Sequence, residues 1–269
     1  MSGATPPAIE LERLRLHALG EAECVERVVE ALGQGRGGWI VTPNLDHLRL
    51  LGRDDALCRV YARADLSVAD GMPLVWASRL QGTPLPGRVA GSDLIWSLSA
   101  AASARGHSVF LLGGDPGTAD ETAARLRASW PALRVAGSLC PRPGFERREE
   151  SLTELAHSLR EARPDLVYVA LGTPKQELLI DRLRMTLPSA WWMGVGASFT
   201  FAAGRVPRAP AWLRRLGLEW LHRLAHEPRR LARRYLVDDL PFGAALMARS
   251  AWRGLRARDA SRPEGIDHA

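Results

Sequence analysis

The sequence predicts an α/β fold: a mostly parallel sheet built from Rossmann-like βαβ units, followed by a basic α-helical C-terminal appendage. Short apolar runs alternate with amphipathic stretches of helical length, which is the pattern of parallel strands joined by helices. Most of the runs end in polar or glycine-rich turns. A third observation, the concentration of arginine near the C-terminus, predicts the appendage. The 269 residues suffice for one or two domains with a sizeable core.

Five apolar runs are the predicted strands, at residues 39–41, 66–68, 109–112, 166–171 and 191–195. Helical patterns follow most of these runs, as they do from Asp46 and from Pro174 onward. Ligands of parallel sheets bind beyond the carboxyl ends of the strands. The turns that follow these runs are therefore expected to form the functional site.

The positive charge of the chain lies almost entirely in one segment. Residues 1–204 carry 22 basic and 23 acidic side chains, whereas residues 205–262 carry 14 arginines against 5 acidic side chains. This asymmetry predicts an anionic partner for the segment, which could be membrane, phosphate or nucleic acid. We expect an α/β core at 1–204, an Arg-rich helical appendage at 205–258 and a disordered tail at 259–269.

The appendage is predicted to contain three helices. One face of the first helix collects Leu213, Leu216, Trp220, Leu221 and Leu224. Pro228 is expected to begin the second helix and Pro241 to end it, with arginines on one side and apolar residues on the other. The third helix covers residues 242–258. Such helices either lie on an anionic bilayer or dock their apolar side on the body and leave the arginines in solvent.

Several common functional classes lack their sequence motifs here. The chain has no P-loop, no Gly-x-Gly-x-x-Gly turn after a strand, no Gly-x-Ser-x-Gly elbow and no Asp-x-Asp motif. The 3 cysteines and 7 histidines are scattered without metal-ligand spacing, and the cysteines fit a reducing compartment. We therefore expect neither a metal nor a cofactor. We also expect no signal peptide and no membrane-spanning helix.

Candidate site residues stand at the ends of the predicted strands. Asp70 directly follows one strand and precedes Gly71, so its carboxylate could act as a general base or could cap the next helix. Thr42 and Asn44 follow another strand and could bind a sugar or nucleotide, or form a helix cap. Lys175, the only lysine of the chain, opens a helix after a third strand, where backbone N–H groups and the helix dipole favour an anion.

Taken in order, these motifs resemble the WecG/TagA/CpsF family of bacterial glycosyltransferases over about residues 9–240. Each motif alone is weak, whereas their order and spacing together are specific. The segments that carry the resemblance are Thr42-Pro43-Asn44, Ala69-Asp70-Gly71, Gly172-Thr173-Pro174-Lys175-Gln176-Glu177, Gly194-Val195-Gly196-Ala197-Ser198-Phe199, Arg208-Ala209-Pro210 and the run from Leu218 to Arg230.

The resemblance implies an inverting, metal-independent transfer of a hexosaminyl or related sugar from a UDP-sugar to polyprenyl-diphosphate-linked N-acetylglucosamine. Enzymes of this kind act in the cytoplasm at the inner face of the membrane, in the synthesis of surface polymers such as teichoic acid or exopolysaccharide. The chain departs from the family at Thr200, where an aspartate is usual. The implied membrane partner is the anionic inner surface, which the Arg-rich appendage would face.

The resemblance also implies a role for individual residues. Asp70 becomes the general base, and Thr42 and Asn44 lie near the donor and acceptor sugars. Lys175 and Gln176 match the donor-site motif. The basic segment adds Arg208, Arg223, Arg230 and Arg233 to the predicted substrate-binding residues, of which the last three match the family's basic appendage that closes over the site.

Two other functional classes stay open beside this one. The chain could be a nucleic-acid-binding protein that uses its arginines, or a catalytically inert, membrane-associated partner in polymer assembly. No recognised nucleic-acid motif occurs, so we expect no nucleic-acid partner. The presence of Asp70 in its motif argues against an inert protein. The sequence leaves the oligomeric state open, a homo-oligomer included.

Overall fold

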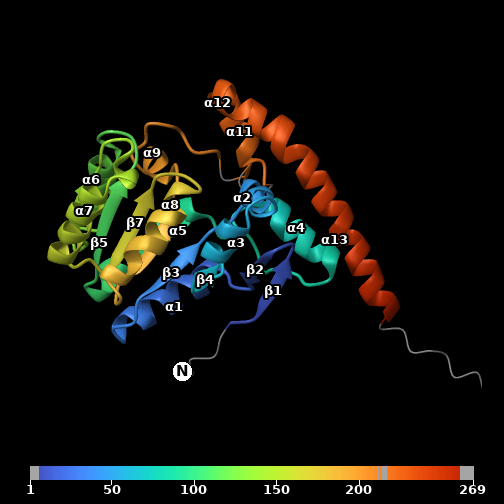
Figure 1. The fold of residues 1–269 in the computed structure, drawn as a ribbon, viewed down its shortest axis with the longest axis horizontal. Helices are drawn as coiled ribbons and strands as arrows, with labels where there is room; N and C mark the ends of the chain where they lie inside the picture. Colours follow the sequence, from blue (N-terminus) through green and yellow to red (C-terminus); the bar gives the residue numbers. More distant parts are fainter. Residues whose placement is uncertain (1–5, 211, 214–216, 261–269) are drawn as a thin grey trace, which may run out of the picture.

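A computed structural model describes residues 6–210, 212–213 and 217–260. Its centre is a six-stranded sheet of order β4-β3-β8-β7-β5-β6, in which every neighbouring pair is parallel (Figure 1). The strands are β3 (Gly38–Val41), β4 (Leu66–Ser67), β5 (Ser108–Gly113), β6 (Arg134–Leu139), β7 (Leu166–Ala170) and β8 (Trp191–Gly194). The predicted α/β fold with a parallel sheet is confirmed, and each of the five predicted runs contains a strand.

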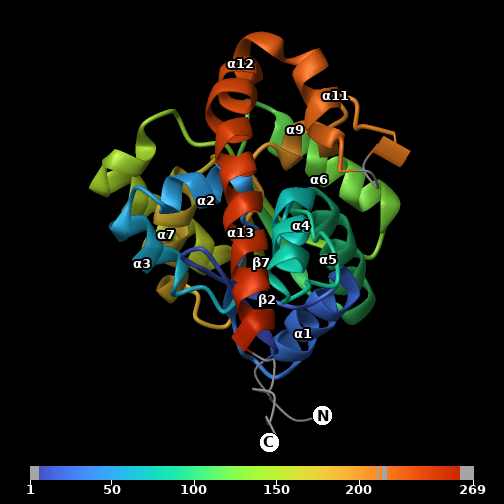
Figure 2. The same cartoon turned by 90° about the vertical axis from the view of Figure 1, so that its right-hand side faces the viewer.

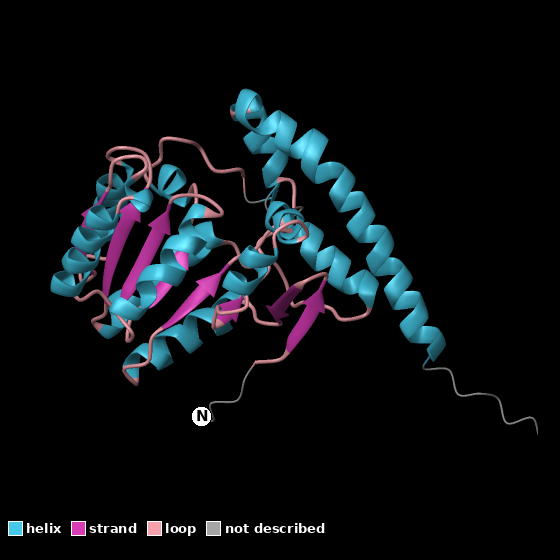
Figure 3. Ribbon diagram, viewed as in Figure 1, coloured by secondary structure: helices cyan, strands magenta, loops and turns pink. Residues whose placement is uncertain are grey.

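Helices cover both faces of this sheet. They are α1 (Glu21–Gly33), α2 (Leu45–Leu51), α3 (Asp55–Tyr61), α4 (Met72–Gln81), α5 (Gly91–Arg105), α6 (Thr118–Ser129), α7 (Glu149–Ala162), α8 (Lys175–Leu183) and α9 (Ser198–Ala202), with short 3-10 turns η1 (Phe145–Arg147) and η2 (Arg184–Thr186). Figure 3 shows these helices flanking the central strands.

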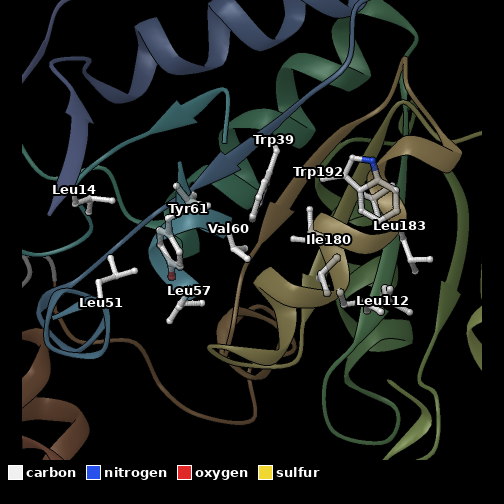
Figure 4. Packing of buried hydrophobic residues seen from close by; sticks show 14 of the residues in the cluster. Leu14, Trp39, Leu51, Leu57, Val60, Tyr61, Leu112, Ile180, Leu183 and Trp192 are labelled. Carbon is white, nitrogen blue, oxygen red and sulfur yellow. The ribbon is translucent and has the colours of Figure 1, made fainter. Parts of the chain in front are cut away.

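The hydrophobic core divides into two layers because successive strand residues point to opposite faces. Val167 and Val169 of β7 pack in the layer under α3, α7 and α8, whereas Leu166 and Tyr168 pack in the layer under α1, α5 and α6. Figure 4 shows the first layer, where Trp192 of β8 lies among side chains of α8. Strands that are buried on both faces appear as continuous apolar runs, which explains why the sequence predicted them.

A hairpin that the sequence did not predict lies beside the sheet. Its strands are β1 (Ala8–Leu11) and β2 (Leu14–His17), paired antiparallel. His17 is buried, and its Nδ1 atom accepts a hydrogen bond from the backbone N–H of Ser67 in edge strand β4 at 3.0 Å. Burial lowers the pKa of His17. The hairpin thus satisfies a backbone group that an edge strand would otherwise expose.

The C-terminal segment differs from its prediction at two helix boundaries. It forms α11 (Glu219–His226), α12 (Pro228–Ala232), a π-helical stretch η3 (Arg233–Asp239) and α13 (Leu240–Ala260). The prediction of a single helix from Leu213 to Leu224 is wrong, because Gly217 adopts a left-handed φ of 74° and α11 begins only after it. Leu216 lies outside the described residues, as does most of the tail predicted at 259–269, of which only residues 259 and 260 are described, at the end of α13.

The prediction that Pro241 ends a helix is also wrong, whereas Pro228 begins α12 as predicted. Helix α13 starts at Leu240 and continues through Pro241. The π-helical stretch lies immediately before this proline, which cannot donate a backbone hydrogen bond to the preceding turn. The wider π-helical turn therefore accommodates the missing hydrogen bond, which would otherwise kink or end the helix.

Helix α13 packs lengthwise against α4, as Figure 2 shows. Leu246 is fully buried at this contact, and Gly254 lies so close to the carbonyl of Leu80 that a larger residue would not fit. Near its far end, Arg249 and Arg253 form ion pairs with Glu12 in the turn of the hairpin, at 3.1 and 3.4 Å. Within the residues described, no helix has the length and apolar character needed to cross a bilayer.

Candidate active site

A cavity of about 620 Å³ lies at the carboxyl edge of the sheet. In Figure 1, β3, β5 and β7 point toward the end of the molecule where α11 and α12 lie. The turns after β3, β4, β7 and β8 form one side of the cavity, and α11, η3 and α13 contribute to the other. The predicted site residues that line it are Thr42, Asn44, Asp70, Gln176 and Arg223.

Asp70 follows β4 and points into this cavity rather than capping the next helix. The N-cap of α4 is Gly71, whose φ of 145° is open to glycine, and no side chain caps this helix. The Asp70 carboxylate instead accepts the backbone N–H of Gly91, the first residue of α5, at 3.4 Å. The helix-cap alternative for Asp70 is therefore wrong for α4.

The surroundings of Asp70 make it a stronger base than an ordinary aspartate. Burial raises the pKa of Asp70 to about 6, and the negative charges of Glu219 and Asp93 add to the increase. The Arg88 guanidinium and the Gly91 N–H oppose it. A carboxyl group with this pKa is suited to accept a proton near neutral pH.

Thr42 and Asn44 lie in the turn after β3, on the same side of the cavity. Asn44 is also the N-cap of α2, where its side-chain oxygen accepts the backbone N–H of His47 at 3.3 Å. The cap alternative for Asn44 is thus correct, and the same residue lines the cavity. Thr42 stands against the start of α5, since a Cβ on Gly91 would lie 3.1 Å from its hydroxyl oxygen.

Gln176 is held in one orientation. Its Oε1 accepts the backbone N–H of Gly196 at 2.9 Å, and its Nε2 donates to Oε1 of Glu177 at 2.9 Å. Both side chains are buried. A Cβ on Gly194 would lie 2.6 Å from the Gln176 amide nitrogen, so this close approach requires glycine in β8.

A chain of hydrogen bonds leads away from Glu177. Thr173 Oγ1 donates to Glu177 Oε1 at 3.1 Å and lies 2.8 Å from Nε2 of His47, whose Nδ1 is 3.2 Å from the Tyr61 hydroxyl. Burial lowers the pKa of His47, which favours the neutral ring with a single N–H. Because the Thr173 proton is directed to the carboxylate, His47 donates through Nε2 and accepts from Tyr61 through Nδ1.

The C-terminal segment brings two arginines to the cavity. The Arg223 guanidinium lies 5.2 Å from the centre of the Phe201 ring, and it forms no ion pair with a carboxylate of the described residues. Arg234 Nε lies 3.2 Å from Asp46 and 3.5 Å from Asp239. Arg234 was not among the predicted site residues.

The other predicted residues lie away from the cavity lining. Lys175 is half exposed and pairs with Glu146 at 3.1 Å. Arg208 donates to Asp93 at 2.8 Å and to the hydroxyl of Ser92 at 2.9 Å. Arg233 is exposed at the surface of η3, and the side chain of Arg230 lies outside what the structure describes.

Besides Arg234, sequence reasoning missed other polar residues of the lining, among them His47, Arg88 and Glu219. His47 was assigned no role, and its place in α2, the helix that follows β3, was its only signal. Arg88 and Glu219 stand 131 residues apart yet form an ion pair at 2.8 Å. Motifs give no signal for such a pair, because only the docking of α11 brings its two members together.

Comparisons with known proteins give the chain's family and a relative. The model of the glycosyl transferase WecG/TagA/CpsF family matches residues 9–256. The chain is 35% identical over 202 residues to the N-acetylglucosaminyldiphosphoundecaprenol N-acetyl-beta-D-mannosaminyltransferase of Bacillus spizizenii. This alignment covers 75% of the present chain and 76% of the relative.

Proposed function

Since the chain belongs to the WecG/TagA/CpsF family of glycosyltransferases, we propose that it transfers a hexosaminyl sugar from a UDP-sugar to polyprenyl-diphosphate-linked N-acetylglucosamine, with inversion and without a metal. The relative from Bacillus spizizenii, named for a mannosaminyl transfer to such an acceptor, supports the choice of substrates. The observation that carries the proposal is a cavity that joins Asp70, whose pKa is raised by burial, to Arg223, which forms no ion pair with a carboxylate of the described residues.

In the proposed reaction, Asp70 removes the proton from an acceptor hydroxyl. The hydroxyl oxygen attacks the anomeric carbon from the face opposite UDP, so the new glycosidic bond forms as the bond to the diphosphate breaks. A single displacement of this kind inverts the anomeric centre and needs no covalent intermediate. Asp70 must be ionised to act, so the rate should fall as the pH drops through about 6.

The departing diphosphate gains negative charge, which must be stabilised in the transition state. Arg223 is the candidate for this task, because its guanidinium reaches the cavity and is not neutralised by a carboxylate of the described residues. Gln176 and Asn44 offer amide groups in fixed orientations for the sugar hydroxyls. Thr42 lies beside them at the end of β3.

A lipid-linked acceptor requires the cavity to approach a membrane surface. Exposed apolar and basic side chains occur together on the C-terminal segment, where Leu236 and Val237 are more than half exposed close to Arg229 and Arg233. Such a surface suits reversible binding to an anionic bilayer. We place the protein at the inner face of the cytoplasmic membrane for this reason.

A transfer assay tests the proposal. The purified chain is incubated with a panel of UDP-sugars and a lipid-diphosphate N-acetylglucosamine analogue, and the product is identified by mass and by the anomeric coupling in its NMR spectrum. We expect one inverted disaccharide product, with the rate unchanged by EDTA. A retained configuration or a strict metal requirement would contradict the mechanism. Absence of transfer together with salt-sensitive binding of nucleic acid would instead favour a nucleic-acid-binding protein that uses its arginines.

A further inference from the structure

An ion pair joins the α/β body to the C-terminal segment directly beside Asp70. Arg88 lies in the loop before α5, and Glu219 is the first residue of α11. Nη1 of Arg88 is 2.8 Å from Oε2 of Glu219, and both side chains are more than four-fifths buried. A charge pair this far from solvent is sensitive to the loss of either partner, because the remaining charge is left buried.

The pair is one end of a chain of alternating charges. Nη2 of Arg88 lies 3.2 Å from Oδ2 of Asp93, and Oδ1 of Asp93 accepts from Nη1 of Arg208 at 2.8 Å. The other terminal nitrogen of Arg208 approaches Glu219 at 4.0 Å. Two arginines and two carboxylates thus alternate in charge, and each terminal nitrogen of Arg88 faces a carboxylate other than Asp70.

Asp70 lies next to this cluster but forms no ion pair within it. Its carboxylate accepts only the Gly91 N–H at 3.4 Å among the described residues. The charged groups that act on it are Arg88 from the loop, Asp93 from α5 and Glu219 from α11. If Arg88 were released by Glu219, it could turn one nitrogen toward Asp70 and make that carboxylate a weaker base.

We propose that Glu219 is a positioning residue for the transfer reaction: by holding Arg88, it keeps the guanidinium from forming a direct ion pair with Asp70, so that docking of α11 makes Asp70 an effective base. This inference rests on the proposed function, in which Asp70 takes the proton of the acceptor. It assigns to the C-terminal segment an effect on proton transfer, separate from any contact it makes with substrate or membrane. An undocked segment leaves the body with a poor base.

The test replaces Glu219 in the full chain and follows Asp70 directly. Glu219→Gln removes the negative charge that raises the pKa of Asp70 and frees one nitrogen of Arg88, and both changes favour the ionised carboxylate. We therefore expect the midpoint of the Asp70 titration, measured by NMR on ¹³C-labelled aspartate, to move to lower pH. In transfer assays the acidic limb of kcat/KM should move in the same direction, with the ratio of activity at pH 5 to activity at pH 8 rising roughly twofold to fivefold.

Two further variants separate this role from a structural one. Glu219→Asp keeps the charge and should leave the titration midpoint near that of the unchanged protein. Glu227→Gln removes a carboxylate at the other end of α11 and should not move the midpoint. A loss of rate with an unchanged acidic limb in Glu219→Gln, or an equal shift in Glu227→Gln, would overturn the inference.

The NMR measurement also keeps this inference distinct from the proposed function. If the unchanged protein transfers no sugar, the proposed function fails, while the titration still reports whether Glu219 sets the state of Asp70. If transfer occurs and the titration midpoint of Glu219→Gln does not move, only the inference fails.

Discussion

The α/β body and the C-terminal segment stabilise themselves by different means. The body buries apolar side chains on both faces of its sheet. In the segment, the buried apolar residues among those described are only Ala209, Leu231, Tyr235 and Leu246. The segment nevertheless carries seven of the twelve large apolar side chains that are exposed in the described chain: Trp212, Leu221, Leu236, Val237, Leu240, Trp252 and Leu255.

This difference shows that the segment is attached to the body through fewer buried apolar side chains. Leu246 packs against the core, and ion pairs to Glu12, Asp46 and Arg88 fix the segment along its length. Its remaining apolar surface stays available for a second environment. In the proposed reaction, the body therefore supplies the base and the substrate turns, and the segment supplies arginines and an apolar exterior.

The largest expected effect concerns the body. Asp70→Asn keeps the shape of the side chain and removes the base, so we expect the transfer rate to fall by about 10²–10⁴-fold while UDP binding is retained. The measurement is kcat with the lipid-linked acceptor, alongside calorimetric binding of UDP. An unchanged kcat would exclude Asp70 as the base.

The same variant should stabilise the folded protein. Above the raised pKa of about 6, Asp70 is ionised and destabilises the folded protein. Below pH 3.8, the ordinary pKa of an aspartate, the carboxyl group is protonated in both the folded and the unfolded protein, so the destabilisation is absent. Asp70→Asn should therefore increase the free energy of unfolding at pH 8 by up to about 3 kcal/mol and change little at pH 3.5. Denaturant titrations at the two pH values provide the comparison, and equal effects at both would contradict the pKa shift.

The next effect concerns the attachment of the segment. Leu246→Ala removes a fully buried side chain of α13, and we expect it to weaken docking or global stability by about 2–4 kcal/mol. Leu255→Ala is the matched control, because Leu255 is on the same helix and is 60% exposed, so its effect should stay within about 0.5 kcal/mol. Hydrogen exchange of α13 measures both. Similar protection in the two variants would mean that α13 is not held by its buried face.

The smallest effect concerns the outer surface. Arg229 and Arg233 are exposed, and each should contribute about 1 kcal/mol to binding of an anionic bilayer. Replacing both by glutamine should lower partition onto phosphatidylglycerol vesicles by roughly 10- to 30-fold in a sedimentation assay. Arg127→Gln with Arg142→Gln, two exposed arginines of the body, is the charge-matched control. An equal loss in the control would show a general charge effect rather than a membrane-facing segment.

The sequence predicted the parts of the fold that are buried on both sides. Strands β5, β7 and β8 appear as apolar runs because each of their residues is buried. Strand β6 escaped prediction because it forms the sheet edge, is only partly buried and contains Arg134 and Gly137. This partly exposed edge strand lacks the continuous apolar pattern on which such a prediction depends, whereas the other edge strand, β4, is buried and was predicted.

The candidate site was predictable where residues stand just beyond a strand, as Thr42 does after β3 and Asp70 does three residues after β4. It was not predictable where a residue acts through a distant partner. Glu219 looks like an ordinary first-turn carboxylate of a helix, and only the docked structure places it against Arg88. For the same reason, the sequence could not show that Lys175 pairs with Glu146 outside the cavity.

The order of residues around the cavity has a consequence for biosynthesis. The first residue of the chain that lines the cavity is Thr42, and the last is Met247, about 200 residues later. A ribosome adding about 5–20 residues per second needs roughly 10–40 s to cover this distance. During that interval the nascent body already contains Asp70 but lacks both the Glu219 contact and α13. If Asp70 and Glu219 act as proposed, sugar transfer begins only after the C-terminal helices have been synthesised and have folded back onto α4.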